Sequence, residues 1–307
     1  MKEGGKMYVL GIDVGGTNIR FGLINEDYEL NDFIIEKSGD LQSEKSSVNN
    51  LKRLIENYLE QSDKEVAAIA IGFPSTLDKK RKKILSTPNI RGLQNIDIVN
   101  ILEEKFKIPV FIETDVNLLM INDIVEAQVA QEGIIMGVYL GTGVGNAIAI
   151  NGELLTGKHG VAAELGHIPM LNGKGKCGCG NEGCVEVYAS GKRLQEICTE
   201  HFKEIPISEI FEQCGEEEII KSFVEMLALP VATEINILDP DVIFIGGGLI
   251  SMKGFPVKLF EAAIHKHARK PFPEQDLHFN YSSLGQENGV RGAGVFAYKQ
   301  LERGEQK

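Results

Sequence analysis

The chain has 307 residues, of which 43% are hydrophobic, and this predicts a globular protein with room for two cores rather than a disordered or fibrous chain. Its formal net charge of −12 argues against general nucleic-acid binding, which depends on clustered lysine and arginine. Because no apolar run reaches the roughly 20 residues of a membrane span and the start lacks a secretory signal, we expect a cytoplasmic protein without membrane or nucleic-acid partners.

The first informative feature is a glycine turn between two strand-like runs. Residues 7–14 form an apolar run that contains Asp13 near its end, and residues 19–25 and 30–37 predict two returning strands. Backbone N–H groups in such a turn can converge on a phosphate, and an aspartate beside it can hold Mg²⁺ or its water shell. The candidate phosphate donors are Gly15, Gly16, Thr17 and Asn18. A tight hairpin without any ligand remains the alternative.

Three regular elements follow the first hairpin. The patterns predict an amphipathic helix over residues 46–61, a buried strand over 66–72 and a helix over about 97–107.

The loops between these elements carry two candidate ligand-binding residues. Ser75, in the turn after the buried strand, offers a hydroxyl, although a plain loop serine is equally compatible with the sequence. The basic run Lys79–Lys83 is interpreted as a solvated turn. Asn89, in the loop over residues 84–93, is a candidate hydrogen-bonding partner for a small polar ligand.

An aspartate stands where a second buried strand meets a long helix. Residues 110–113 read VFIE, and Asp115 follows at the predicted start of a helix. Its carboxylate could cap that helix by accepting its first free N–H groups. Alternatively, a carboxylate at the carboxyl end of a strand is well placed to act as a general base.

The second half of the chain repeats the strand, glycine turn, strand layout. Residues 133–155 contain GTGVG at 141–145 between two apolar runs, and this turn could grip a polyphosphate together with the first one. A later buried strand ends in Gly246–Gly248 before a predicted helix, where a purine and ribose could lie on bare backbone. Further helices are predicted around Cys198 and Cys214, which we interpret as inert, and at the C-terminus.

Four metal-binding side chains are concentrated in one glycine-rich segment. His167, Cys177, Cys179 and Cys184 form a Cys3His set, which would fill a tetrahedral zinc ion and leave no position open for water. Glu164 and Glu186 bracket this cluster. Ordinary buried thiols or one disulfide remain the alternative. However, the chain has only two cysteines outside the cluster, and so few suit a reducing compartment better than a disulfide framework.

Taken together, these motifs resemble the ROK family of sugar kinases. The matching stretches are GIDVGGTN (11–18), GFP (72–74), TDVN (114–117), GTGVG (141–145), ELGH (164–167), CGCGNEGCVE (177–186) and IGGG (245–248). They follow the family's order and cover nearly the whole chain.

The resemblance implies a fold class and a domain division. The fold would be an α/β, two-lobed actin-like ATPase (ribonuclease H-like) fold with a cleft between the lobes and a zinc-bound loop. Residues 1–114 would form the small lobe, completed by a C-terminal helix at about 290–307, and residues 115–289 the large lobe.

The resemblance also implies the roles of the site residues. Asp115 would be the catalytic base, and the metal would be structural Zn²⁺ held by His167, Cys177, Cys179 and Cys184. The sugar would contact Ser75, Asn89, Thr114, Asp115, Glu164, His167 and Glu186. ATP with Mg²⁺ would be held by Gly11, Asp13, Gly15, Gly16, Thr17, Asn18, Gly141, Thr142, Gly143, Gly145, Gly246, Gly247 and Gly248. A homodimer is expected because many relatives are homodimers.

Two departures from the family bear on the sugar. The family usually has glycine at the position of Ser75 and asparagine at that of Thr114. With STPN (86–89), DVNL (115–118) and HGVAAELGHIP (159–169), the departures most resemble the D-allose kinase branch. We therefore expect phosphorylation of D-allose at its 6-hydroxyl, the alternatives being a glucokinase, fructokinase or N-acetylmannosamine kinase.

A non-catalytic, sugar-responsive regulator is the alternative from another class. A repressor would need a DNA-binding domain before the first hairpin, yet only ten residues precede Gly11 in this sequence. A sensor without catalysis would have no need for Asp13, Asp115 and both glycine turns.

Overall fold

The described chain forms two compact units. The computed structural model describes residues 7–42, 46–87, 90 and 92–305. The first unit comprises Met1–Val129, Thr156–Ala162 and Gly285–Lys307, and the second comprises Ala130–Leu155 and Ala163–Leu284. The chain therefore passes repeatedly from one unit to the other before it ends in the first.

The first unit is built on a mixed sheet with the strand order β3-β2-β1-β4-β7. Its strands are β1 (Tyr8–Val14), β2 (Asn18–Asn25), β3 (Leu30–Lys37), β4 (Val66–Phe73) and β7 (Val110–Thr114). Strands β1, β2 and β3 pair antiparallel, whereas β4 is parallel to both β1 and β7. A small ribbon of β5 (Thr76–Leu77) and β6 (Ile84–Ser86) follows β4.

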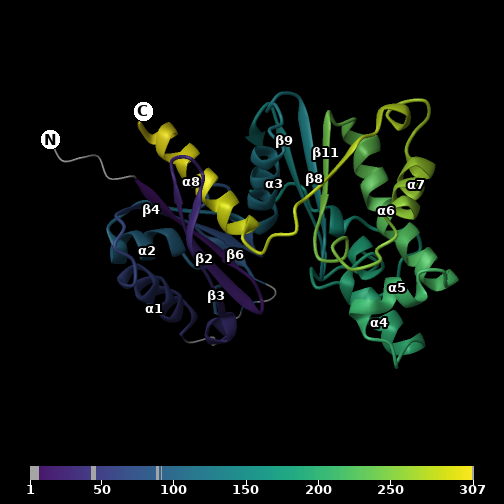
Figure 1. The fold of residues 1–307 in the computed structure, drawn as a ribbon, viewed down its shortest axis with the longest axis horizontal. Coiled ribbons are helices and arrows are strands. Elements are labelled where there is room, and N and C mark those ends of the chain that lie inside the picture. Colours follow the sequence, from purple (N-terminus) through teal and green to yellow (C-terminus); the bar gives the residue numbers. More distant parts are fainter. Residues whose placement is uncertain (1–6, 43–45, 88–89, 91, 306–307) are drawn as a thin grey trace. The chain divides into compact units, whose positions relative to one another are not determined.

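Helices cover both faces of this sheet (Figure 1). They are α1 (Ser47–Glu60), α2 (Ile98–Phe106), α3 (Asp115–Glu126) and α8 (Asn288–Glu305), and a short helix η1 (Ser38–Gln42) precedes α1. Alternate side chains of β1 and β2, such as Leu10, Ile12 and Phe21, join the apolar faces of α1 and α2 in one core cluster. Helix α8 packs on β1, β2 and β4 and on α3.

The second unit repeats the arrangement of a hairpin beside a parallel strand. Its sheet has the order β10-β9-β8-β11-β12, in which β8 and β9 are antiparallel and β8, β11 and β12 are parallel. The strands are β8 (Ile134–Leu140), β9 (Val144–Ile150), β10 (Glu153–Leu154), β11 (Val242–Gly246) and β12 (Phe279–Tyr281). The internal repeat predicted from the two glycine turns is confirmed.

The helices of the second unit bury their apolar faces in a separate core. They are α4 (Gly191–His201), α5 (Ile210–Cys214), α6 (Glu218–Leu238) and α7 (Val257–His267), with short helices η2 (Leu165–His167), η3 (Val185–Val187), η4 (Ile207–Glu209) and η5 (Glu274–Asp276). Cys198 and Cys214 are buried in α4 and α5, as expected for inert thiols.

Most of the predicted elements are confirmed, with one clear difference. The helix predicted directly after Gly246–Gly248 begins only at Val257, because turns occupy the intervening residues. Gly247 has a φ of +100°, a left-handed conformation that ends the strand without starting a helix. Among the described residues, no helix is both long and apolar enough to cross a membrane.

The observed division of the chain differs from the predicted lobes 1–114 and 115–289. Helix α3 and the segment Thr156–Ala162 belong to the first unit. The reason is packing, since α3 lies so close to α8 that a Cβ added at Gly292 would stand 1.9 Å from the Leu118 carbonyl oxygen. The C-terminal helix completes the first unit, as α8 packs on three of its strands.

Candidate functional site

Two predicted carboxylates lie at one edge of the first unit's sheet. The parallel register pairs Asp13 of β1 with Gly72 of β4, and Phe73 with Thr114 at the end of β7. The carboxyl ends of β1 and β7 therefore meet at this edge, on either side of β4. Asp115 follows immediately, as the first residue of α3.

Asp115 has the electrostatics of a proton acceptor near neutral pH. Thr114 occupies the N-cap position of α3 without a side-chain cap hydrogen bond. The Asp115 Oδ1 accepts the Val116 N–H at 2.9 Å, so the capping alternative is met in part. Burial, and then the negative charge of Asp13, raise the pKa of Asp115 to about 7. A carboxyl group with this pKa is half-ionised at neutral pH and can accept a proton in a reaction there.

The first glycine turn is closed by backbone bonds and by an ion pair that the sequence did not predict. The Gly15 N–H donates to the Asn18 carbonyl at 2.9 Å, and Gly16 and Thr17 are exposed. Arg20 Nη1 lies 3.0 Å from Asp13 Oδ2. Burial nevertheless raises the pKa of Asp13, against the lowering effect of Arg20. Asp13 is therefore a partly buried carboxylate that a cation already neutralises.

Gly11 has a packing role within the same unit. A Cβ at this position would stand 2.4 Å from the Val290 carbonyl oxygen of α8. Packing against α8 thus explains the glycine at position 11 without the predicted contact with a nucleotide.

The predicted sugar-binding residues of the first unit are only partly described. Ser75 Oγ is buried and has no hydrogen-bond partner among the described residues. A buried hydroxyl without a partner is costly, so this atom is a candidate for contact with a polar ligand. Asn89 lies outside the described residues.

A buried ion pair, missed by the sequence analysis, supports the strand that leads to Asp115. Arg81 Nε donates to Glu113 Oε2 at 2.9 Å, and the side chain of Glu113 is only 2% exposed. Glu113 Oε1 also accepts the Asn117 side-chain amide and the Thr114 N–H. Arg81 Nη1 donates to the Gly160 carbonyl at 2.9 Å. The interpretation of Lys79–Lys83 as a solvated turn is therefore wrong for Arg81.

In the second unit, the two predicted nucleotide-binding segments meet, and the N-terminus of α4, which was not predicted to bind, joins them. The Gly141 carbonyl accepts the Gly191 N–H at the start of α4 at 2.8 Å. The Leu140 carbonyl accepts the Leu249 N–H at 2.9 Å, just after the Gly246–Gly248 turn. The turn over residues 141–145, the Gly246–Gly248 turn and the N-terminus of α4 thus form one backbone surface suited to an anion.

Glu186 connects this surface to the predicted metal cluster. Its Oε2 accepts the Val144 N–H at 3.1 Å, and a Cβ at Gly143 would stand 2.2 Å from the same oxygen. With a larger residue at position 143, the Glu186 carboxylate would have to move away from the Val144 N–H.

The four predicted metal ligands come together. The ligand atoms of His167, Cys177, Cys179 and Cys184 all lie within 4.8 Å of one another. The His167 Nδ1 to Cys177 Sγ distance is 3.4 Å, and the Cys179 Sγ to Cys184 Sγ distance is 3.7 Å. Tetrahedral zinc with its usual bond lengths places such atoms about 3.5 and 3.8 Å apart. The donor set and its spacing fit Zn²⁺.

The other ring nitrogen of His167 lies near Glu164, a predicted sugar-binding residue. Nε2 lies 3.7 Å from Glu164 Oε2, whose side chain is 52% exposed. The pKa of Glu164 is raised by partial burial and by the charge of Glu186, and lowered by His167. Glu164, His167 and Glu186 therefore form one polar group beside the metal cluster.

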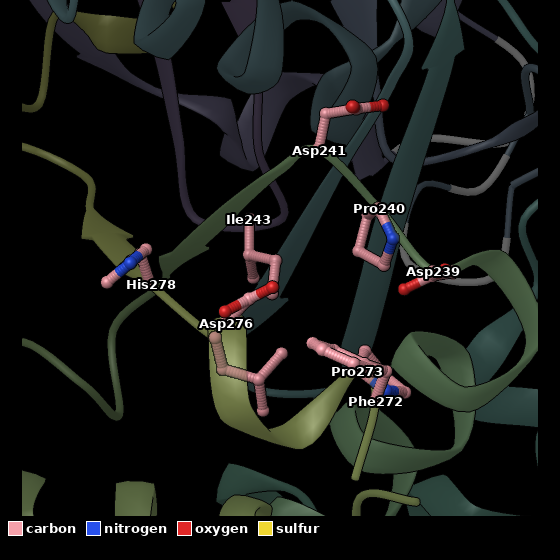
Figure 2. A pocket seen from close by; sticks show the side chains of 9 residues that line it. Asp239, Pro240, Asp241, Ile243, Phe272, Pro273, Asp276 and His278 are labelled. Carbon is pink, nitrogen blue, oxygen red and sulfur yellow. The ribbon is translucent and has the colours of Figure 1, made fainter.

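A separate pocket lies at the start of β11, the end opposite to the Gly246–Gly248 turn (Figure 2). Its volume is about 180 Å³, and its lining includes Asp239, Asp241, Asp276 and His278. None of the predicted site residues lines it.

Comparison with known proteins agrees with the resemblance seen in the sequence. The model of the ROK family matches residues 9–300. A glucokinase of Thermotoga maritima is 29% identical over 80% of this chain and 83% of its own length. An N-acetyl-D-glucosamine kinase of Histophilus somni is 28% identical over 92% and 96%. The crystal structure of a ROK hexokinase from Thermus thermophilus superposes with a TM-score of 0.79 and 27% identity, covering 97% of this chain and all of that one.

Proposed function

The chain belongs to the ROK family as an ATP-dependent sugar kinase, and from this premise we propose that it phosphorylates the 6-hydroxyl of a hexose, D-allose in particular. The fold that it shares with these kinases is the actin-like ATPase fold.

Asp115 is the observation that carries the reaction type. Its carboxyl group stands at a strand edge beside Asp13, with a pKa of about 7. In the proposed reaction it accepts the proton of the sugar hydroxyl as that oxygen attacks the γ-phosphorus of ATP and ADP departs. General bases contribute roughly 10²- to 10⁴-fold, and the remaining acceleration comes from positioning and from charge stabilisation.

The polar groups of the second unit are proposed to bind the sugar. Glu164, Glu186 and the His167 Nε2 would pair with ring hydroxyls, as would Ser75 and Thr114 of the first unit. The unpartnered Ser75 Oγ supports this assignment. A site that pairs its buried polar groups with particular hydroxyls rejects sugars that leave those groups unpaired.

The backbone surfaces at the glycine turns are proposed to hold ATP. Asp13 would hold Mg²⁺ directly or through water, and the ion would neutralise phosphate charge. The Asp13 to Arg20 ion pair shows that this carboxylate already accepts a cationic partner. Zn²⁺ in the Cys3His cluster would be structural, because the four protein ligands leave no coordination site for a substrate.

The choice of D-allose rests on the sequence departures at Ser75 and Thr114. Allose differs from glucose in the orientation of one hydroxyl, and we assign the changed side chain next to the base as the hydrogen-bonding partner of that hydroxyl. Relatives named for glucose and N-acetyl-D-glucosamine make those sugars the principal competitors.

The deciding experiment is ADP release by the purified protein with MgATP and a panel of hexoses. We expect kcat/KM for D-allose to exceed that for D-glucose, D-fructose, N-acetyl-D-glucosamine and N-acetyl-D-mannosamine by at least about tenfold. Equal or better use of another hexose contradicts the allose assignment, and no turnover of any sugar contradicts the kinase.

A pair of aspartate variants tests the role of the base in the same assay. Asp115→Asn should lower kcat by about 10²-fold or more while sugar binding persists. Asp97→Asn is the control, since Asp97 is likewise an aspartate at the start of a helix of the first unit. Near-normal turnover by Asp115→Asn rules out the proposed base.

A further inference from the structure

An acidic side chain interrupts the buried face of α6. Glu234 is 5% exposed, and its neighbours Val231, Ala232 and Ile235 are buried in the core of the second unit. The apolar stripe of this helix includes Phe223, Leu227 and Val231, so a large apolar residue is expected at position 234. A buried carboxyl group needs a compensating interaction, because its transfer from water is unfavourable.

Glu234 is connected by hydrogen bonds to the segment that contains Glu164 and His167. The side-chain amide of Asn146, on β9, donates through Nδ2 to Glu234 Oε1 at 2.5 Å. Asn146 Oδ1 in turn accepts the backbone N–H of Leu165 at 2.9 Å. The orientation of this amide is fixed, since the N–H of Leu165 requires an oxygen and leaves Nδ2 to face the carboxyl group.

The backbone group at the end of this chain lies between two proposed ligand-binding side chains. Leu165 begins η2, preceded by Glu164 and followed two residues later by His167. Helix α6 packs directly on η2. The backbone at Gly166 is equally confined, because a Cβ there would stand 2.6 Å from the Val144 carbonyl oxygen.

We infer that Glu234 and Asn146 are positioning residues, which fix η2 so that Glu164 faces the sugar and His167 keeps its place in the Cys3His cluster. The part that concerns the sugar rests on the proposed function, whereas the part that concerns η2 does not. Both side chains are buried, so we assign their effect on the site to the hydrogen bond at the Leu165 N–H.

The protonation of Glu234 agrees with this role. Burial raises the pKa of Glu234 to about 8, against the lowering effect of Asn146. The carboxyl group is therefore mostly protonated at pH 7, and in this form Oε1 accepts the Asn146 amide without a buried negative charge. Oε2 has no hydrogen-bond partner among the described residues, which again favours the neutral form. A glutamine side chain would reproduce this neutral acceptor.

Three variants of α6 distinguish positioning from simple core stability. Glu234→Gln keeps the acceptor oxygen, Glu234→Leu removes it, and Val231→Ala loses core packing one turn away without touching the hydrogen-bonded chain. The purified full-length variants are compared by hydrogen–deuterium exchange of the peptide that contains residues 164–167, by zinc affinity, and by KM and kcat for the preferred hexose.

We expect Glu234→Leu to speed exchange around Leu165 and to raise the sugar KM, each about tenfold, with kcat changed less. Glu234→Gln should stay within about twofold of the wild type in both readouts. Val231→Ala should lower the melting temperature and leave exchange, zinc affinity and KM unchanged.

Two results overturn the inference. One is a Glu234→Leu protein that loses stability as Val231→Ala does but keeps wild-type exchange around Leu165. The other is a Glu234→Gln protein as impaired as Glu234→Leu, since the acceptor oxygen would then not matter. The exchange measurement does not require kinase activity. It therefore tests the positioning of η2 even if the protein phosphorylates none of the sugars.

Discussion

At the scale of the residue, the chemistry depends on carboxyl groups whose surroundings give them different protonation states. Asp115 is near its midpoint at neutral pH, whereas Glu234 is mostly protonated there. Both are acidic side chains at buried or partly buried positions. Burial disfavours the charged form, and a cationic or hydrogen-bonding partner decides how far the balance moves.

The raised pKa of Asp115, the proposed general base, predicts the pH dependence of the proposed reaction. A general base must be unprotonated, so kcat/KM should rise with pH through a midpoint near 7. Since the Asp13 charge contributes to this shift, Asp13→Asn should lower the pKa of Asp115 and move the acidic limb to lower pH, even if its activity is reduced. Rate profiles between pH 5 and 9 measure this, with Asp97→Asn as the unshifted control. An acidic limb unmoved in Asp13→Asn would show that Asp13 does not act on the base.

At the scale of the element, the Cys3His cluster is the main constraint proposed for a segment that has little core of its own. The described residues between His167 and Cys184 form no helix, only turns and isolated β-bridges, and Leu171 among them is 92% exposed. Its backbone order comes from a few turns and bridges, such as Met170 N–H to the Gly183 carbonyl at 2.8 Å. Such a segment has little apolar burial to stabilise it, so the ligand cluster is its main constraint.

If the cluster holds the proposed Zn²⁺, its removal should therefore weaken the proposed sugar binding rather than the chemistry. We expect Cys177→Ser, or treatment with a strong chelator, to raise the sugar KM by about 10- to 100-fold because His167 and its neighbour Glu164 lose their fixed positions. Cys198→Ala, which alters a buried thiol outside the cluster, should retain metal and KM. Metal analysis accompanies the kinetics of each sample. Protein shown to be metal-free with a normal KM would contradict a structural role.

At the scale of the whole molecule, the first unit is finished by the last helix of the chain. Helix α8 packs on β1, β2 and β4, which are encoded more than 200 residues earlier, and on α3. Contacts so distant in sequence form only after most of the chain is available, so this unit depends on long-range pairing.

The close approach of α8 to α3 can be tested by two alanine substitutions in one helix. A Cβ at Gly292 would stand 1.9 Å from the Leu118 carbonyl oxygen, whereas one at Gly304 meets no atom within 4 Å. Gly292→Ala should therefore destabilise the protein by about 1–3 kcal/mol. Gly304→Ala should stabilise it slightly, since alanine favours the helix by up to about 1 kcal/mol. Urea unfolding measures both, and equal midpoints would show that α8 does not pack as described.

The sequence alone determined the local elements and the residue types of the site. Alternation and glycine turns predicted both hairpins, and the close spacing of His167, Cys177, Cys179 and Cys184 predicted the cluster that the structure brings together. These features are local, because a period of two, a turn or a short loop is specified within a few neighbouring residues.

Only the tertiary structure decided which distant side chains act on one another. Arg81 looked like a solvated basic residue, and Glu234 was unremarked on its helix, yet each enters a buried network with a partner 32 or 88 positions away. Likewise, α3 belongs to the first unit because the absence of a side chain at Gly292 lets α3 pack closely on α8. Burial and hydrogen-bond partners of this kind arise from packing between elements, and no local pattern in the chain encodes them.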